Sequence, residues 1–195
     1  MSLPTDLPVP VDDGACGHLV GRSVPGVRLP STTGGLIDLA DATRGWAAIY
    51  VYPATGAPGV AMPEGWSAIP GARGCTPQAC AYRDDHARFR ELGVEVYGLS
   101  TQSTAAQQEF AAREHIPFPL LSDPEQAIGR ALDLPTFQAG GVARYRRVTL
   151  VVRAGQILHV RYPVFPPDGD AEETLQWLRG RYNANRADGD GPGVV

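Results

Sequence analysis

The sequence predicts a single α/β domain built around a mixed sheet, and three observations carry this prediction. Short apolar runs rich in β-forming residues alternate with segments of helical periodicity, as in WAAIYVY at 46–52 and VEVYGLS at 94–100. Hairpin signals flank this alternating part on both sides. The length of 195 residues, of which 43% are hydrophobic, suits one domain with a full core.

The N-terminal half predicts a hairpin, two buried strands and two helices. VRLPSTTGGLIDL at 27–39 predicts the hairpin, which turns at its two glycines. After the cysteines, residues recur at helical spacing over 79–92, between the strands 46–52 and 94–100. A second helix is expected to run from Thr104 through Glu114, with a capping box formed by Thr104 and Gln107.

The C-terminal half predicts a short strand, a helix, a second hairpin and a last helix. FPLL is the short extended piece, and Asp123 before Pro124 predicts a helix start with the acid as cap. RVTLVV and QILHVRY form the hairpin, and Asp170 with Glu173 begins the last helix. Strands separated by helices imply parallel pairing, with the closing hairpin as an antiparallel edge. This is a three-layer α/β sandwich of the thioredoxin type, with a mixed sheet, flanking helices and an N-terminal β-hairpin.

Composition divides the chain into a domain with two loose ends. Residues 1–17 are rich in Pro, Asp and Gly and predict a flexible N-terminal arm. Residues 18–182 form the domain, and 183–195 lack an apolar period and predict a mobile tail. Within the domain, 54–74 is crowded with Gly and Pro. A loop of that length in a compact domain is usually functional.

Charge and hydropathy exclude several classes of protein. The formal net charge of −4, from 17 basic and 21 acidic residues, argues against a nucleic-acid surface. No apolar stretch approaches the roughly 20 residues that cross a bilayer, so no membrane partner is expected. The first 14 residues contain no Lys or Arg and lack the pattern of a secretory signal. A cytoplasmic protein with reduced thiols is therefore expected.

RGCTPQACAYRD at 73–84 holds two of the three cysteines, with four residues between them. In a reducing compartment such a pair is metal-binding, catalytic or redox-cycling more often than a structural bridge. A zinc site is disfavoured because no His lies at ligand spacing from the pair, so neither a metal nor a cofactor is expected. Cys16 lies in the N-terminal arm and is expected to take no part.

Cys75 lies where a loop becomes a helix, and the free N–H groups and dipole there favour a thiolate over a thiol. If the helix includes Cys75, the Cα atoms of Cys75 and Cys80 lie roughly 8 to 9 Å apart. That exceeds the ~7 Å reach of a disulfide, so the first turn would have to unwind. If the helix begins only at Pro77, less movement is needed, and the spacing leaves both possibilities open. Cys80 could also be a small core residue on the helix.

GCTPQAC followed by AYRD resembles the signature of the Q-type peroxiredoxins, the bacterioferritin comigratory protein group. The similarity continues through VEVYGLSTQS, FPLLSDPEQAIGRAL and RRVTLVV, and covers roughly residues 20–182 in the same order. The resemblance implies reduction of hydrogen peroxide and organic hydroperoxides on a thioredoxin-like fold. It implies Cys75 as the peroxidatic thiolate and Cys80 as the resolving thiol in an intramolecular disulfide. It also implies regeneration by thioredoxin or a similar dithiol protein, and two thiols on one chain permit a monomer.

The same resemblance places an arginine just before the strand RVTLVV. Here that residue is Arg147, with Arg146 as the alternative if the register differs by one. A forked guanidinium suits both a thiolate and a leaving oxygen, although it could also pair with a surface carboxylate. Gln78 could add an amide contact near the first turn, but an exposed helix glutamine is the commoner case.

One position departs from the family pattern. The threonine usually found three residues before the reactive cysteine is replaced by Ala72. The strand-end proline of the pattern corresponds to Pro53, which here lies some 20 residues before Cys75. Thr55 is therefore the first candidate for the missing hydroxyl and Ser67 a weaker one, although Thr55 could equally be a turn residue.

Two rival functions remain open on the sequence alone. One is a general thiol–disulfide oxidoreductase, disfavoured because four residues rather than two separate the cysteines. The other is a thioredoxin-fold binding module without peroxidase activity, which would use the loop 54–74 as its contact surface. The altered threonine position is the main support for this second alternative.

Overall fold

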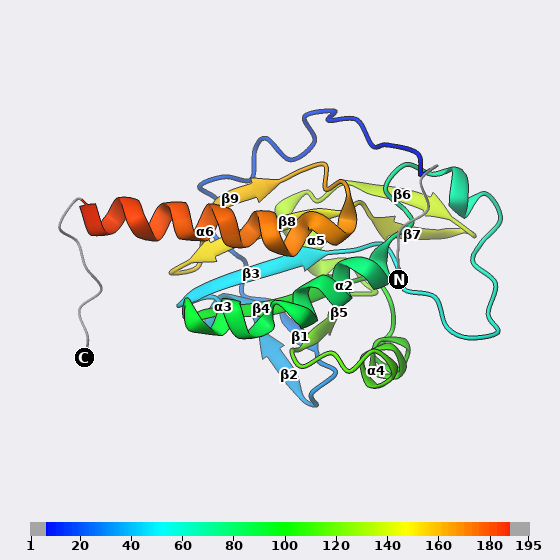
Figure 1. Ribbon diagram of the computed structural model, residues 1–195. Coiled ribbons are helices and arrows are strands. Elements are labelled where there is room, and N and C mark those ends of the chain that lie inside the picture. The colour runs from blue at the N-terminus through cyan, green and yellow to red at the C-terminus, as the bar shows by residue number, and fades with distance from the viewer. Residues whose placement is uncertain (1–6, 188–195) are drawn as a thin grey trace.

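A computed structural model describes residues 7–187, and its centre is a five-stranded mixed sheet (Figure 1). The strand order is β5-β4-β3-β8-β9, in which β3 pairs parallel with β4 and antiparallel with β8. The sheet confirms the predicted mixture of parallel strands with an antiparallel hairpin at one edge. Its strands are β3 (Trp46–Val51), β4 (Val94–Ser100), β5 (Leu120–Ser122), β8 (Val148–Arg153) and β9 (Gln156–Arg161).

Two small hairpins lie outside this sheet. The first, β1 (Arg28–Pro30) with β2 (Leu36–Asp38), is the one that the sequence predicts. The second, β6 (Thr136–Ala139) with β7 (Val142–Tyr145), was not predicted. Gly140 and Gly141 both have positive φ angles at its turn. The Gly-Gly pair was therefore a hairpin signal that the sequence carried.

Helices cover both faces of the sheet and complete the three-layer sandwich. One face is covered by the helices that carry Tyr82, Phe89, Phe110 and Leu175, which pack with Tyr50 of β3. These are α2 (Cys75–Asp84), α3 (His86–Glu91), α4 (Thr104–Arg113) and α6 (Asp170–Ala187). Among residues 7–187, no helix is both long and apolar enough to span a membrane.

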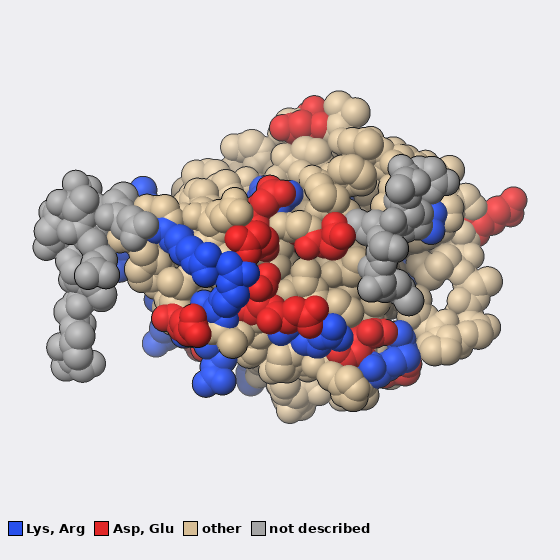
Figure 2. All heavy atoms as spheres, in the orientation of Figure 1, with Lys and Arg blue, Asp and Glu red and all other residues tan. Residues whose placement is uncertain are grey.

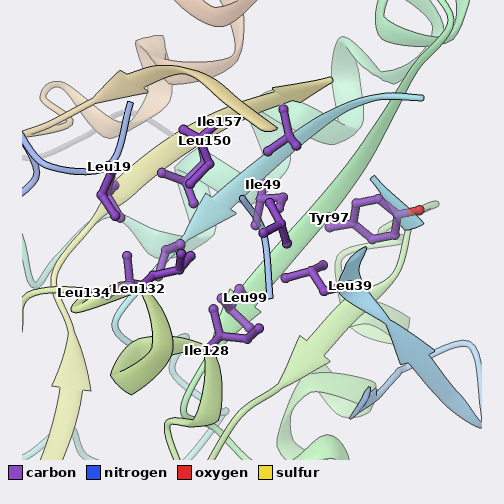
Figure 3. Close-up of a cluster of buried hydrophobic side chains, with 14 of the residues drawn as sticks. Leu19, Leu39, Ile49, Tyr97, Leu99, Ile128, Leu132, Leu134, Leu150 and Ile157 are labelled. Atoms are coloured by element: carbon purple, nitrogen blue, oxygen red, sulfur yellow. The ribbon is translucent and has the colours of Figure 1, made fainter. Parts of the chain in front are cut away.

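The opposite face is covered by α1 (Leu39–Ala42), α5 (Ala127–Leu132) and the segment before β1. Figure 3 shows this second core, where Leu19, Leu39 and Ile128 surround Ile49 of β3. Successive residues of β3 serve the two cores in turn, as the period of a strand requires. On the face shown in Figure 2, several basic side chains lie together along α6, next to a group of acidic ones.

Three helix boundaries differ from those predicted. The helix after the cysteines is interrupted at Asp85, which separates α2 from α3. Ser103 rather than Thr104 caps α4, because the Ser103 hydroxyl accepts from the amide of Ala106 at 3.3 Å. The helix predicted from Asp123 begins only at residue 127, since Gln126 adopts a left-handed φ of 52°. The carboxylate of Asp123 nevertheless accepts from the first amides of α5.

Both ends of the described chain are more ordered than the sequence predicts. Cys16, placed by the sequence in a flexible arm, is only 3% exposed and packs in the same core as Leu19. At the other end, α6 continues beyond 182 to Ala187, and residues 188–195 lie outside the described residues. An apolar anchor around Cys16 and Leu19 therefore fastens the N-terminal segment to the domain.

The segment 54–74 has a small core of its own. It contains one short 3-10 turn, η1 (Trp66–Ala68). Trp66 packs with Ala54 and Ala72 of the loop and lies 5.8 Å, ring centroid to centroid, from Phe137 of β6. The unpredicted β6–β7 hairpin thus supports the loop that leads to Cys75.

Gly129 of α5 provides a test of core packing. A Cβ built there would lie 2.5 Å from the ring of Tyr145, whose hydroxyl is hydrogen-bonded to Asp123. We expect Gly129→Ala to lower the free energy of unfolding by about 1 to 3 kcal/mol. Gly180→Ala in α6 is the control, because a Cβ there meets nothing within 4 Å, and a gain of about 0.5 to 1 kcal/mol is expected. Urea unfolding measures both, and equal effects would contradict this packing.

Candidate active site

The loop 54–74 ends in a sharp turn that starts α2 at Cys75. Gly74, the N-cap residue, has a φ of 98°, which only glycine adopts without strain. No side chain of residues 7–187 caps this end of α2, so the first amides of the helix are free to act as donors. The Sγ atom of Cys75 lies 3.6 Å from the carbonyl oxygen of Ala72, and the residue is 4% exposed.

Arg147, just before β8, places its guanidinium directly beside this sulfur. Its Nη2 atom lies 3.3 Å from the Sγ of Cys75. The same nitrogen donates to the carbonyl oxygens of Arg73 at 3.1 Å and Gly71 at 3.3 Å. The side chain is 3% exposed, so a fixed positive charge is held next to the thiol and away from solvent.

Gln78 holds the other arm of the guanidinium. It is fully buried, and its Oε1 atom accepts a hydrogen bond from Nη1 of Arg147. Its Nε2 atom donates to Oδ2 of Asp170 at 2.7 Å. Because an arginine only donates and an ionised aspartate only accepts, the orientation of the amide between them is fixed. The sequence favoured an exposed glutamine here, although a position three residues after Cys75 lies on the same face of α2.

Asp170, at the start of α6, is the buried end of this chain of contacts. The same Oδ2 atom accepts from the hydroxyls of Thr149 at 2.7 Å and Tyr82 at 3.0 Å. Burial raises the pKa of Asp170, while the hydrogen bonds from Thr149 and Gln78 act in the opposite direction. The sequence identified Asp170 only as a helix start, because its link to the site is a tertiary contact.

Cys80 lies on the same helix but faces a different environment. Since α2 begins at Cys75, the structure has the first of the two arrangements considered from the sequence, with the Cα atoms roughly 8 to 9 Å apart. None of the three cysteines forms a disulfide in this structure. Cys80 is partly exposed in a hollow of about 340 Å³, lined also by Thr76, Pro77, Ala81, Arg83, Asp84, Glu114 and Asp168.

The surroundings of Cys80 hold it as a thiol. Its Sγ atom lies 3.7 Å from Oε2 of Glu114. Burial raises the pKa of Cys80; the charge of Arg83 lowers it, and the charge of Glu114 raises it again. The sequence did not identify Glu114, which ends α4 and approaches Cys80 only in the folded chain.

None of the remaining candidates is hydrogen-bonded to the Cys75 sulfur. Thr55 is 7% exposed, and its hydroxyl donates to Oε1 of Gln102 at 3.1 Å. Pro53 is buried at the end of β3, and Ser67 is exposed in the 3-10 turn. Arg146 pairs with Asp13 on the surface, at 3.4 Å. The structure thus brings together Cys75, Arg147 and Gln78, and it gives no hydrogen bond to Cys75 from the other candidates.

A thioredoxin-like sandwich with a cysteine at an uncapped helix start and a guanidinium beside it defines a class of thiol-active proteins. Comparison with known families narrows this class. The model of the Redoxin family matches residues 19–176. The chain therefore belongs to the Redoxin family, and its relatives and the predicted signature make it a Q-type peroxiredoxin.

The relatives are peroxiredoxins of plants and bacteria. Peroxiredoxin Q of Arabidopsis thaliana chloroplasts is 27% identical over 159 residues, which are 82% of this chain and 66% of that protein. The chain thus spans about two thirds of that relative. The chloroplastic peroxiredoxin Q of Gentiana triflora is 30% identical over 131 residues, 67% of this chain and 53% of that protein.

Among solved structures, peroxidoxin BcpB of Mycobacterium tuberculosis superimposes with a TM-score of 0.68 at 27% identity. The match covers 84% of this chain and 98% of BcpB. Peroxiredoxin Q of Xanthomonas campestris shares the fold, with a TM-score of 0.64 at 23% identity over 90% of this chain and 98% of that one. The predicted fold class and family are both confirmed.

The buried carboxylate of Asp170 makes a prediction about stability and pH. A pKa raised in the folded state means that the folded protein binds this proton more tightly than the unfolded chain does. The contribution of Asp170 to the free energy of unfolding is therefore most favourable at low pH and is lost as the pH rises above about 4. Relative to Asp170→Asn, we expect the wild-type protein to lose stability between about pH 4 and pH 7. A difference in urea midpoints that stays constant over this range would contradict the prediction.

Proposed function

We propose that this chain is a thiol-dependent peroxidase that reduces hydrogen peroxide and organic hydroperoxides through Cys75. The observation that supports this most is the 3.3 Å contact between Nη2 of Arg147 and the reactive sulfur. The guanidinium and the free amides of α2 stabilise negative charge on the sulfur, and a thiolate is the nucleophilic form of cysteine.

In the first step, the thiolate of Cys75 attacks one oxygen of the hydroperoxide. An S–O bond forms, the O–O bond breaks, and the second oxygen leaves as hydroxide or alkoxide, which takes up a proton. Arg147 can donate to both oxygens as charge moves from sulfur to the leaving group. The product on the enzyme is the sulfenic acid of Cys75.

In the second step, the thiol of Cys80 condenses with this sulfenic acid. The Cys80 sulfur displaces hydroxide from the Cys75 sulfur, and the released proton completes a water molecule, leaving an intramolecular disulfide. Since both residues are within α2, its first turn must unwind before the sulfurs meet. The raised pKa of Cys80 keeps it a thiol until that opening.

Pro53 and Thr55 are assigned to the wall of the peroxide site. Both are buried where the chain leaves β3. The Thr55 hydroxyl donates a hydrogen bond to Oε1 of Gln102, so its oxygen keeps the capacity to accept a hydrogen bond from a hydroperoxide. Thr55 would thereby take over the role of the hydroxyl that Ala72 lacks.

Recycling requires a dithiol reductant, for which we propose thioredoxin or a similar protein. The hollow around Cys80 would give such a partner access to the Cys80 sulfur of the disulfide. A monomer suffices for the cycle because both thiols are on one chain. A reducing compartment such as the cytoplasm suits the cycle, since the reductant must itself be kept reduced.

Exchange of either cysteine separates the two steps. Cys75→Ser should abolish peroxide consumption, because serine is not a thiolate nucleophile. Cys80→Ser should consume one equivalent of peroxide per chain and then stop, because this variant cannot form the Cys75–Cys80 disulfide that thioredoxin would reduce. Stopped-flow mixing with peroxide and a thioredoxin-coupled assay measure the two steps. Turnover by Cys75→Ser would refute the role of Cys75, and absence of peroxide-driven thiol loss in the wild type would favour a general oxidoreductase or a binding module.

The guanidinium of Arg147 is tested by two neighbouring substitutions. Arg147→Gln removes the charge and should lower the second-order rate constant with hydrogen peroxide by roughly 10²- to 10³-fold. Arg146→Gln is the matched control, because Arg146 is exposed and contacts Asp13 and the carbonyl oxygen of Thr136 rather than the sulfur, so a change of less than about twofold is expected. Equal rate constants for the two variants would show that the charge beside the sulfur is not used.

A further inference from the structure

Residues 7–13, which we call the N-terminal strap, lie across the Arg147 side of the site. Leu7 and Pro8 of the strap line a cavity of about 10 Å³ whose wall includes the guanidinium-bearing Arg147. That volume holds about one water molecule. The other residues around it are Ile69, Gly71, Arg73, Val164, Phe165 and Pro167. In Figure 1 the strap belongs to the dark-blue segment along the upper edge of the molecule.

The middle of the strap lies on the loop that delivers Cys75. A Cβ on Gly71 would be 3.7 Å from the ring of Pro10, so this ring lies against the Gly71 backbone. The carbonyl oxygen of the same Gly71 accepts from Nη2 of Arg147. The strap therefore covers the loop segment that holds the guanidinium.

Polar contacts at Asp13 fasten the end of the strap. Oδ1 of Asp13 accepts from the hydroxyl of Tyr162 at 3.0 Å, and Oδ2 pairs with Arg146 at 3.4 Å. Both contacts are exposed to solvent and are therefore weak. Three residues further on, the chain is anchored in the core at Cys16. The strap is thus held firmly at one end and loosely along its length.

The two groups at the proposed reactive centre are nearly closed to solvent, and the strap narrows the space on the Arg147 side. Cys75 and Arg147 are only 4% and 3% exposed. A hydroperoxide must bring one oxygen to the Cys75 sulfur and its leaving oxygen to Arg147. An organic group on the leaving oxygen would therefore lie near the cavity beside Arg147, and a large group needs more room than the single water molecule that this cavity could hold.

We propose that the N-terminal strap determines peroxide specificity, favouring hydrogen peroxide when closed and admitting bulky organic hydroperoxides when Asp13 releases it. This inference rests on the proposed peroxidase function. It makes the segment 7–13 part of the substrate boundary, although none of its residues takes part in the bond changes.

Asp13→Ala tests the strap against a matched control. Asp12→Ala removes an adjacent exposed carboxylate that accepts only from the local amide of Gly14. We expect Asp13→Ala to raise the rate constant for oxidation by cumene hydroperoxide about two- to tenfold over Asp12→Ala. The change should be this small because exposed contacts such as those of Asp13 contribute little free energy. The constant for hydrogen peroxide should change less than twofold. Leu7→Ala, which widens the cavity and leaves the Asp13 contacts intact, should move the ratio in the same direction.

Hydrogen exchange of the strap supplies the second measurement. Backbone amides of residues 11–15 should exchange faster in Asp13→Ala than in Asp12→Ala. Equal ratios of the two peroxide rate constants in all variants would overturn the proposal, whether or not exchange is faster. Loss of reaction with hydrogen peroxide in the wild type would instead refute the peroxidase function, so the two failures are distinguishable.

Discussion

The contact between the guanidinium of Arg147 and the sulfur of Cys75 is the interaction on which the rest of this site depends. A charge buried at 3% exposure is costly unless its donors are satisfied. The carbonyl oxygens of the loop and the amide of Gln78 satisfy them in part. Among residues 7–187, the Nε atom of Arg147 has no hydrogen-bond partner, which leaves the guanidinium with a further donor beside the sulfur.

Buried hydrogen bonds extend from Arg147 to parts of the chain that are distant in sequence. Gln78 links Arg147 to Asp170, and Asp170 in turn gathers the hydroxyls of Thr149 and Tyr82. Helix α2, strand β8 and helix α6 are thereby joined by buried hydrogen bonds rather than by apolar contacts alone. Cys80 lies outside this network in a surface hollow, which suits the movement that the proposed cycle requires of it while the guanidinium stays in place.

The sequence predicted most of the fold because periodicity and turn residues carry that information locally. The strands, the first and last hairpins and the start of α6 at Asp170 all follow from such patterns. Local patterns did not predict the cap at Ser103, the late start of α5 or the burial of Cys16. Competing local hydrogen bonds and tertiary packing decide these features. For the site, the motif indicated Cys75, Cys80 and Arg147. Glu114 and the role of Asp170 lie beyond sequence reasoning, since only folding brings them to their partners.

Peptide mass mapping after one equivalent of hydrogen peroxide tests the central claim most directly. If the sulfur beside Arg147 receives the peroxide oxygen, the reduced protein should yield a disulfide between Cys75 and Cys80, with Cys16 still a thiol. A peptide map in which Cys75 remains reduced, or in which Cys16 carries the oxidation, would contradict the account.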